Sequence, residues 1–263
     1  FATVSVPVSR SMGLATSMSS FSLRFSSPAA SRASIECAPS VAFRTISPCA
    51  AASANDPSLD RLLAMGCWTP QETFGARGEW SAATLQPDAG VFDVQRLGAV
   101  VGQVCWDLIG RHNASNALAA IAAAQDAGVA VETACAALGE FESVKRRLEV
   151  VGVAREITVY DDFAHHPTAI AGALVSLRAR WPEHRIIACF EPRSNTSRRN
   201  VFQQAYTEAF DSADLVVIAP PQNLARIPED ERFDAKKLVS DLRGRGREAF
   251  IWGLGPDGPY PPD

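Results

Sequence analysis

The sequence predicts an α/β protein with a mostly parallel, dinucleotide-binding-like sheet. Beyond residue 147, short apolar runs rich in valine and isoleucine alternate with longer segments of helical periodicity. This alternation is typical of strands and helices that follow one another in a parallel sheet. The chain has 263 residues, 47% of them hydrophobic, which is enough for one large or two modest domains with separate cores.

The first part of the chain differs in composition from the rest. Residues 1–53 are rich in serine and arginine, contain no lysine, and carry a single acidic residue, Glu36. They show no sustained helical or strand period, so we expect a disordered or leader-like segment and no folded domain. The composition is typical of an organelle transit peptide. Because the chain starts at Phe1, we favour instead a fragment or an out-of-frame translation of GC-rich DNA.

A first ordered domain is expected over residues 54–141. Leu59, Leu62 and Leu63 have helical spacing, and an alanine-rich run further along has high helix propensity. Between them, two alternating runs joined at Leu97-Gly98 predict an antiparallel pair of strands. The expected elements are a helix over 58–65, strands over 91–94 and 100–106, and helices over 117–127 and 131–141.

A second domain is expected over residues 142–252, followed by a Gly/Pro-rich tail at 253–263. Its expected strands are 148–153, 157–160, 185–190, 215–219 and 249–252, and its expected helices are 167–179, 200–210 and 235–242. Ligands bind at the carboxyl ends of the strands in such sheets. Polar residues that directly follow a strand are therefore the candidate site residues.

Charge and hydropathy favour small-molecule chemistry. The net charge of −4 gives no basic face for nucleic acid, and no run reaches the roughly 20 apolar residues that a membrane span requires. No pair of cysteines has metal-ligand spacing. We expect reduced thiols in a cytoplasmic protein, with Cys135 and Cys189 buried and inert. The six cysteines are Cys37, Cys49, Cys67, Cys105, Cys135 and Cys189.

The most informative polar cluster follows the expected strand that ends at Tyr160. It reads Asp161-Asp-Phe-Ala-His-His-Pro167. A proline at the first helical position marks a helix N-terminus, where free N–H groups and the helix dipole favour phosphate. The carboxylates could hold ribose hydroxyls and an imidazole could face a phosphate; turn-forming aspartates and a capping histidine are the alternative. Metal binding is a weaker alternative, because adjacent residues of a strand point to opposite faces.

Three further clusters are candidates. After the strand over 185–190, Arg193 with Ser194 and Asn195 could grip a carboxylate, or form an ordinary polar loop. Before the alanine-rich helix, asparagine side chains could pair with the adenine edge or cap the helix. The run Lys145-Arg-Arg-Leu-Glu149 has a solvated basic turn as its default interpretation.

Four motifs, taken in order, resemble the Mur ligase family. They are Gly110-Arg-His-Asn-Ala-Ser-Asn116, Arg146-Arg-Leu-Glu149, Tyr160-Asp-Asp-Phe-Ala-His-His-Pro-Thr168 and Glu191-Pro-Arg-Ser-Asn-Thr196. The resemblance covers about residues 55–250 and implies the end of a central ATPase domain followed by a C-terminal Mur-ligase domain. The last motif and Met65-Gly-Cys-Trp-Thr-Pro70 look most similar to the subfamily that attaches a murein tripeptide to UDP-N-acetylmuramate.

This resemblance implies an ATP- and Mg²⁺-dependent amide ligase that forms an acyl phosphate on the muramyl carboxylate. The implied partners are UDP-N-acetylmuramate and the tripeptide L-Ala-γ-D-Glu-meso-diaminopimelate. By similarity, adenine would contact His112, Asn113 and Asn116, and ribose would contact Asp162. The ATP phosphates would meet the catalytic candidates Arg147 and His165. The acidic peptide would meet Arg193, Ser194 and Asn195.

The chain also departs from the family pattern. It contains no Gly-Lys-Ser/Thr, so the loop that cradles phosphates in such enzymes is absent from this sequence. The metal ligands of the family are likewise not found, and we assign none here. We therefore expect residues 1–263 by themselves not to ligate. Two alternatives stay open, namely a UDP-N-acetylmuramate:L-alanine ligase and a non-catalytic nucleotide- or peptide-binding module.

Overall fold

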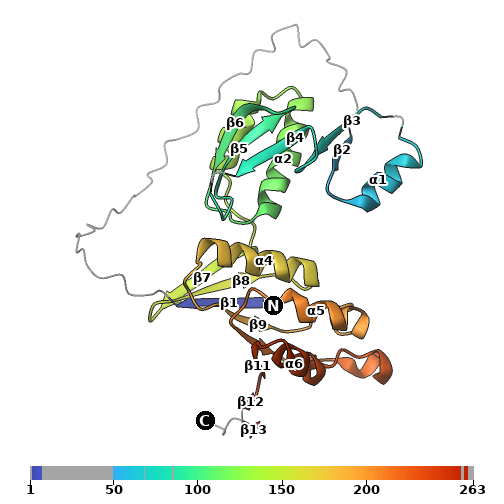
Figure 1. The fold of residues 1–263 in the computed structure, drawn as a ribbon, viewed down its shortest axis with the longest axis vertical. Coiled ribbons are helices and arrows are strands. Elements are labelled where there is room, and N and C mark those ends of the chain that lie inside the picture. The colour runs from blue at the N-terminus through green and yellow to red at the C-terminus, as the bar shows by residue number, and fades with distance from the viewer. Residues whose placement is uncertain (1, 8–49, 68, 85, 256–257, 260–263) are drawn as a thin grey trace, which may run out of the picture.

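The computed structural model describes residues 2–7, 50–67, 69–84, 86–255 and 258–259, which form two α/β parts joined by the segment after α3 (Figure 1). The first part contains a sheet of order β2-β3-β4-β5-β6. Its elements are β2 (Ala50–Ser53), α1 (Pro57–Ala64), β3 (Gln71–Phe74), β4 (Trp80–Thr84), β5 (Val91–Arg96), β6 (Ala99–Cys105), α2 (Arg111–Asp126) and α3 (Val131–Gly139).

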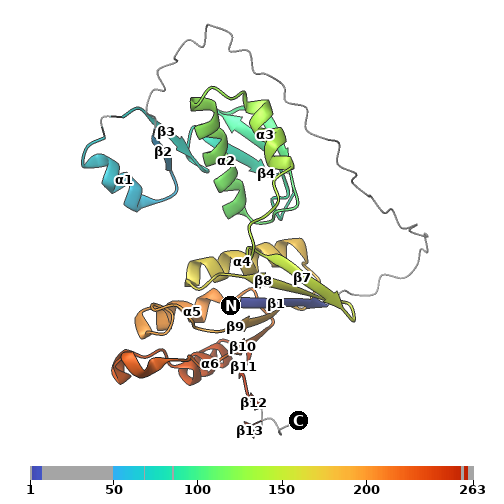
Figure 2. The ribbon, with the colours of Figure 1, turned by 180° about the vertical axis from the view of Figure 1, so that it is seen from behind.

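The helices α2 and α3 cover one face of this first sheet (Figure 2). The core that they close contains Trp80 and Phe92 from the strands and Ile121 from α2, all fully buried. The predicted strand pair is confirmed as β5 and β6, which pair antiparallel. The strands β3 and β4 were not predicted, because the short runs Gln71–Phe74 and Trp80–Thr84 carry few large apolar residues.

The second part contains a sheet of order β13-β12-β11-β10-β9-β1-β8-β7. Its elements are β1 (Ala2–Pro7), β7 (Glu149–Ala154), β8 (Ile157–Asp162), α4 (Pro167–Arg180), β9 (Ile187–Phe190), η1 (Asn200–Phe202), α5 (Gln203–Ala209), β10 (Leu215–Ile218), η2 (Leu224–Arg226), η3 (Glu229–Glu231), α6 (Ala235–Gly244), β11 (Glu248–Ile251), β12 (Leu254–Gly255) and β13 (Gly258–Pro259).

The predicted α/β class is confirmed, and the sheet of the second part is mixed. The strands β8, β9, β10 and β11 run in the same direction, as expected for a parallel sheet. However, β1 lies antiparallel between β8 and β9, and β7 and β12 are also antiparallel to their neighbours. The strands β1, β7 and β12 therefore run opposite to the parallel strands that the helices connect, whereas β13 at the far edge runs in the same direction as β11.

The expectation that residues 1–53 contain no regular structure is wrong at both ends of that segment. Ala2–Pro7 forms β1 and Ala50–Ser53 forms β2, while residues 8–49 lie outside the described residues. The sequence Thr-Val-Ser-Val at residues 3–6 has high strand propensity. Pairing on both sides satisfies the backbone of this short segment, which composition averaged over 53 residues did not reveal.

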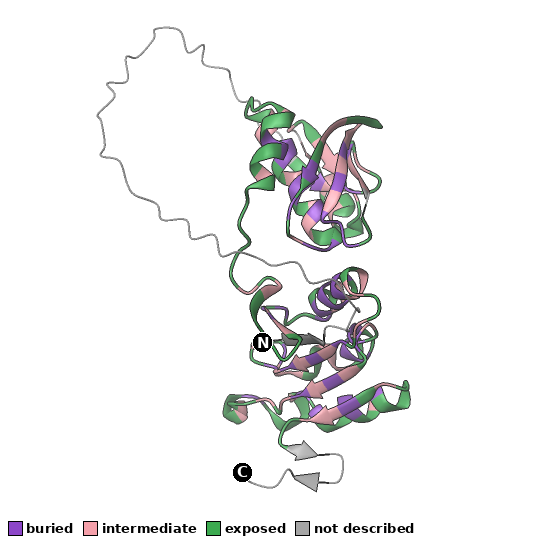
Figure 3. Cartoon of the chain, turned by 90° about the vertical axis from the view of Figure 1, so that its left-hand side faces the viewer, coloured by how far each residue is buried: buried purple, intermediate pink, exposed green. Residues whose placement is uncertain are grey.

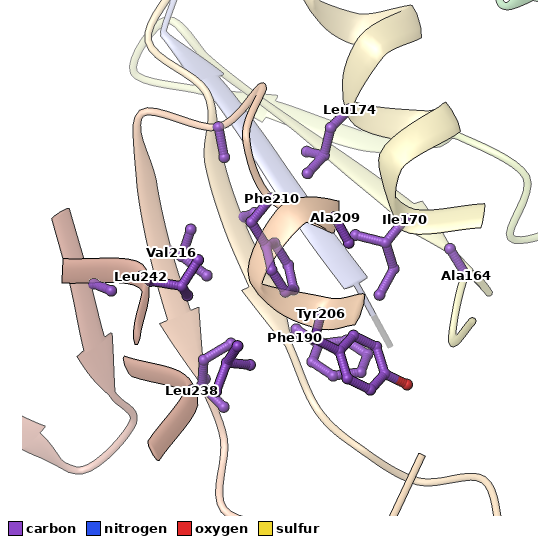
Figure 4. Close-up of a cluster of buried hydrophobic side chains, with 14 of the residues drawn as sticks. Ala164, Ile170, Leu174, Phe190, Tyr206, Ala209, Phe210, Val216, Leu238 and Leu242 are labelled. Carbon is purple, nitrogen blue, oxygen red and sulfur yellow. The ribbon is translucent and has the colours of Figure 1, made fainter. Parts of the chain in front are cut away.

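The core of the second part lies between its sheet and the row of helices α4, α5 and α6 (Figure 4). Ile170 and Leu174 of α4 belong to this core together with Tyr206 of α5, whose ring lies 5.2 Å from that of Phe190 in β9. Buried and half-buried residues alternate along β9 and β10 (Figure 3), which is the period of a strand with one well-covered face. This packing fixes the carboxyl ends of the parallel strands.

None of the helices in the described part of the chain is long and apolar enough to cross a membrane.

Candidate functional site

A cavity of about 700 Å³ lies between the two parts. It brings together five of the residues that the sequence singles out, from both parts of the chain. These residues are His112, Asn113, Asn116, Arg147 and Asp162. The remaining wall is mostly apolar and includes Trp106, Leu108, Leu138 and Phe141, with the polar residues Ser143, His166 and Thr168 beside them. The apolar residues were missed because nothing in their local pattern distinguishes a cavity wall from a core.

The start of α2 approaches α4 closely because residue 110 is glycine. Gly110 has φ 101°, and its N–H donates to the carbonyl of Asp88 at 2.6 Å. A Cβ on this residue would lie 2.3 Å from Oγ of Ser176 in α4 and 2.6 Å from the ring of His112. Only glycine therefore allows the two helices to form this wall of the cavity.

His112 stands in the first turn of α2. The helix starts at Arg111, six residues before the expected start at 117, so His112, Asn113 and Asn116 lie inside the helix and not ahead of it. Partial burial lowers the pKa of the His112 imidazole below its ordinary value, and the charge of Arg147 adds to this, while Asp162 acts in the opposite direction. At neutral pH this ring is uncharged, which suits stacking or hydrogen bonding to a neutral base.

Asn113 and Asn116 follow on the same helix, three residues apart and therefore on neighbouring positions of one face. Nδ2 of Asn113 donates to the carbonyl of Ile109 at 2.8 Å, which fixes the side chain. Its Oδ1 is an acceptor beside the cavity. An amide pair of this kind offers the donors and acceptors that match the edge of a purine.

Asp162 fastens the loop that carries Arg147. One carboxylate oxygen accepts the N–H of Leu148 at 2.8 Å and the other accepts the N–H of Ala164 at 2.7 Å. The N–H of Phe163 donates to the carbonyl of Arg146, so the loop is held at two successive points. Asp162 is buried, whereas Arg147 is exposed at the cavity. The carboxylate thus fixes the backbone from which a cation reaches the cavity.

The two adjacent histidines have different surroundings. His165 does not line the cavity; its ring is exposed, with Nδ1 3.2 Å from the carbonyl of Phe163. His166 lines the cavity, and its Nδ1 accepts the N–H of Thr168 as the N-cap of α4. Pro167 carried the signal that could have indicated this, because the residue before a proline at N1 is the cap.

The second predicted group lies apart from the large cavity, after the end of β9. Arg193 lines a smaller cavity of about 420 Å³ and pairs with Glu191 at 2.8 Å. Ser194 exchanges hydrogen bonds with Ser197, and Oδ1 of Asn195 accepts from Arg198 at 2.8 Å. The hydrogen bonds of Ser194 and Asn195 therefore stabilise the loop conformation, and the side chain of Arg193 is exposed at the smaller cavity.

Thiols and metal ligands are the remaining candidates. In the part of the chain that the structure describes, Cys67, Cys105, Cys135 and Cys189 are free. Cys135 is buried as expected, whereas Cys189 is only half-buried, and desolvation raises the pKa of both thiols. The same part contains no group of three histidine, cysteine, aspartate or glutamate residues that could hold a metal ion.

Comparison with known proteins identifies the family of the second part of the chain. The family model of the Mur ligase glutamate ligase domain matches residues 146–252. The ligase of Haemophilus influenzae named UDP-N-acetylmuramate–L-alanyl-gamma-D-glutamyl-meso-2,6-diaminoheptandioate ligase is 47% identical over 174 residues, 66% of this chain and 38% of that protein. A UDP-N-acetylmuramate–L-alanine ligase of Roseiflexus castenholzii is 39% identical over 175 residues, 64% of this chain and 36% of that protein.

A solved structure of a murein peptide ligase is also similar to this chain. The murein peptide ligase of Psychrobacter arcticus superposes with a TM-score of 0.55 at 32% identity, covering 78% of this chain and 43% of that one. The chain spans less than two fifths of the length of the two curated relatives. The resemblance inferred from the motifs is confirmed: the chain carries, over residues 146–252, the Mur ligase glutamate ligase domain.

Proposed function

We propose that the cavity between the two parts binds the adenine nucleotide of an ATP-dependent amide ligase. The observation that carries this proposal is the convergence of the start of α2, the 146–148 loop and the end of β8 on one cavity. His112, Asn113 and Asn116 would meet the base, and Arg147 would meet the phosphates. A planar base fits an apolar wall with a few fixed polar groups.

The residues fit a nucleotide better than a bound metal. Arginine pairs well with phosphate, and Arg147 projects from a loop whose backbone is fixed by Asp162. Asp162 also lies at the cavity, where it would accept a ribose hydroxyl with lone pairs that its backbone bonds do not use. ATP would supply the activated phosphoryl group together with Mg²⁺, but the described residues do not build a site for Mg²⁺. This chain's own contribution is binding and positioning.

The whole ligase would join UDP-N-acetylmuramate to the tripeptide L-Ala-γ-D-Glu-meso-diaminopimelate. The higher identity to the tripeptide-adding relative supports this choice over L-alanine. Arg193, exposed beside the second cavity, would receive a carboxylate of the peptide. A binding titration of tripeptide against free L-alanine separates the two candidates, since an enzyme for L-alanine would show no preference for the longer ligand.

The nucleotide proposal is tested by titrating the purified chain with ADP in a calorimeter. Replacing Arg147 by alanine removes a charge-assisted contact, and we expect affinity to fall about tenfold or more. His112→Ala should also weaken binding. Arg226→Ala is the matched control, because Arg226 is an exposed arginine in η2 and does not line the cavity. Equal affinities for the wild-type chain, Arg147→Ala and Arg226→Ala would exclude the cavity as the nucleotide site.

A further inference from the structure

The residues on either side of Arg147 have an unusual backbone conformation. Arg146 has φ 63° and Leu148 has φ 50°, both in the left-handed region, which residues with bulky side chains rarely adopt. Arg155 and Glu156 also have positive φ, but they form the two-residue turn between β7 and β8, where a tight hairpin requires it. Arg146 and Leu148 lie in the connection between α3 and β7 and belong to no hairpin (Figure 2). Such strain persists only where surrounding contacts hold it in place.

Two carboxylates provide these contacts, one on each side of Arg147. Oδ2 of Asp162 accepts the N–H of Leu148, and Oε2 of Glu149 accepts the N–H of Arg146, each at 2.8 Å. Glu149 is the first residue of β7 and is half-buried, so the sheet fixes its backbone. Each strained residue therefore has its N–H bound to a carboxylate that a strand of the second sheet carries.

The two adjacent arginines of this loop have different surroundings. Nε of Arg146 lies 3.4 Å from Oδ2 of Asp161, and Cζ lies 4.9 Å from the centre of the Phe163 ring. Arg147 is exposed and belongs to none of the ion pairs among the described residues. It lines the large cavity and also a further cavity of about 630 Å³, the linker cavity, which Glu149 lines too. The direction of the Arg147 side chain therefore depends on the backbone from which it projects.

We propose that Glu149 is a positioning residue for Arg147 and acts through the N–H of Arg146. Together with Asp162, it holds the strained loop in the conformation that directs the Arg147 guanidinium toward the phosphates, and this role rests on the proposed nucleotide site. Strain of this kind is found at sites whose geometry is fixed before the ligand binds. A ligand binds only the molecules that already have the competent conformation, so a loosened loop lowers the apparent affinity by the lost fraction.

The length and the charge of the Glu149 side chain can be tested separately. The N–H of Arg146 needs an acceptor oxygen at the right distance, which Glu149→Gln keeps. Glu149→Asp keeps the charge and shortens the side chain by one methylene group. In calorimetric titrations of the full chain with ADP, we expect the glutamine variant to stay within about twofold of wild type and the aspartate variant to lose about fivefold in affinity. The reverse order would show that the charge acts directly, for example in the linker cavity, and would overturn the proposal.

A double-mutant cycle separates positioning of Arg147 from a general loss of structure. If Glu149 acts only through Arg147, Glu149→Asp should not lower the affinity further in a chain that already carries Arg147→Ala. A further loss of about fivefold in that background would mean that Glu149 acts by another route, against the proposal. Glu248→Asp is the matched control, because Glu248 is also the first residue of a strand, pairs with Arg185 and lines neither cavity. It should leave ADP affinity unchanged.

Failure of the nucleotide site and failure of the positioning role give different results. A wild-type chain without measurable ADP affinity would exclude the nucleotide site and with it this role of Glu149. Wild-type binding that Glu149→Asp leaves unchanged would exclude only the role of Glu149. Circular dichroism confirms the folding of each variant. If Glu149→Asp does not fold, Glu149→Gln decides, since a folded glutamine variant that loses about fivefold or more in affinity contradicts the proposal.

Discussion

At the scale of single residues, Asp162 shows how one side chain serves both structure and site. The motif suggested a ligand contact, and the structure shows both carboxylate oxygens accepting backbone N–H groups from the two segments beside the cavity. Because those N–H groups belong to Leu148 and Ala164, the carboxylate determines where Arg147 stands. The position of Arg147 is therefore set by a residue 15 places later in the chain.

Asp162→Asn tests this positioning role. An amide keeps one acceptor oxygen and puts an N–H₂ group against a backbone N–H, so one buried donor loses its partner. We expect a loss of about 1–3 kcal/mol in the free energy of unfolding, measured by urea denaturation. Asp241→Asn, which breaks a surface pair with Lys237, should change it by less than about 1 kcal/mol. A similar small change for both variants would contradict the role of Asp162.

At the scale of elements, the contact between α2 and α4 depends on Gly110, where two separate constraints exclude a residue with a side chain. Gly110 has a positive φ, which costs an L-residue backbone strain, and it also lacks room for a Cβ beside Ser176. The positive φ is a constraint on the local backbone, whereas the clash with Ser176 is a constraint on the packing between the two helices. The second residue of α2 is His112, so any shift at Gly110 also moves the cavity wall.

Gly98 provides a control that separates backbone strain from steric clash, because it has only the first constraint. It has φ 83° with nothing within 4 Å of a built Cβ, so Gly98→Ala tests strain alone. We expect about 1 kcal/mol of destabilisation for Gly98→Ala and clearly more for Gly110→Ala, because Ser176 must also move. Urea denaturation measures both. ADP affinity should fall for Gly110→Ala only. If the two alanine variants lose the same stability, the helix contact contributes nothing.

At the scale of the whole molecule, an ion pair joins the two parts. Arg180, at the end of α4, lies 2.6 Å from Asp88, a buried residue of the β4–β5 connection. Burial alone would raise the pKa of Asp88, but hydrogen bonds from Arg180 and the N–H of Gly90, with the charge of Arg180, lower it overall. The folded protein therefore binds this proton more weakly than the unfolded chain.

The pH dependence follows from that direction. The stabilisation that Asp88 provides is complete above its ordinary pKa of 3.8 and is lost as the pH falls through the lowered pKa of the folded state. Asp88→Asn should therefore be less stable than wild type near neutral pH, and the difference should shrink on acidification below about pH 4. Thermal unfolding at several pH values measures this. Asp211→Asn, an exposed partner of Arg245, is the control and should show little difference at any pH.

The sequence predicted most elements of the second part but few of its contacts. Helices over 167–179 and 235–242 match α4 and α6, since periodicity, Pro167 at the first position of α4 and the N-cap Asp234 of α6 act locally. The strands β3 and β4 lack such a pattern and depend on pairing with neighbours. Predictions were thus correct where the signal lies within a few residues and failed where distant pairing decides.

The sequence by itself determined the α/β class, the order of most strands and helices of the second part, and the motifs that resemble a Mur ligase, because each depends on local periodicity or on short strings of residues. Only the tertiary structure decided that His112 and Arg147 share one cavity, that His166 lines it while His165 does not, and that β1 lies between β8 and β9. These facts depend on contacts between segments far apart in the chain, which have no local pattern.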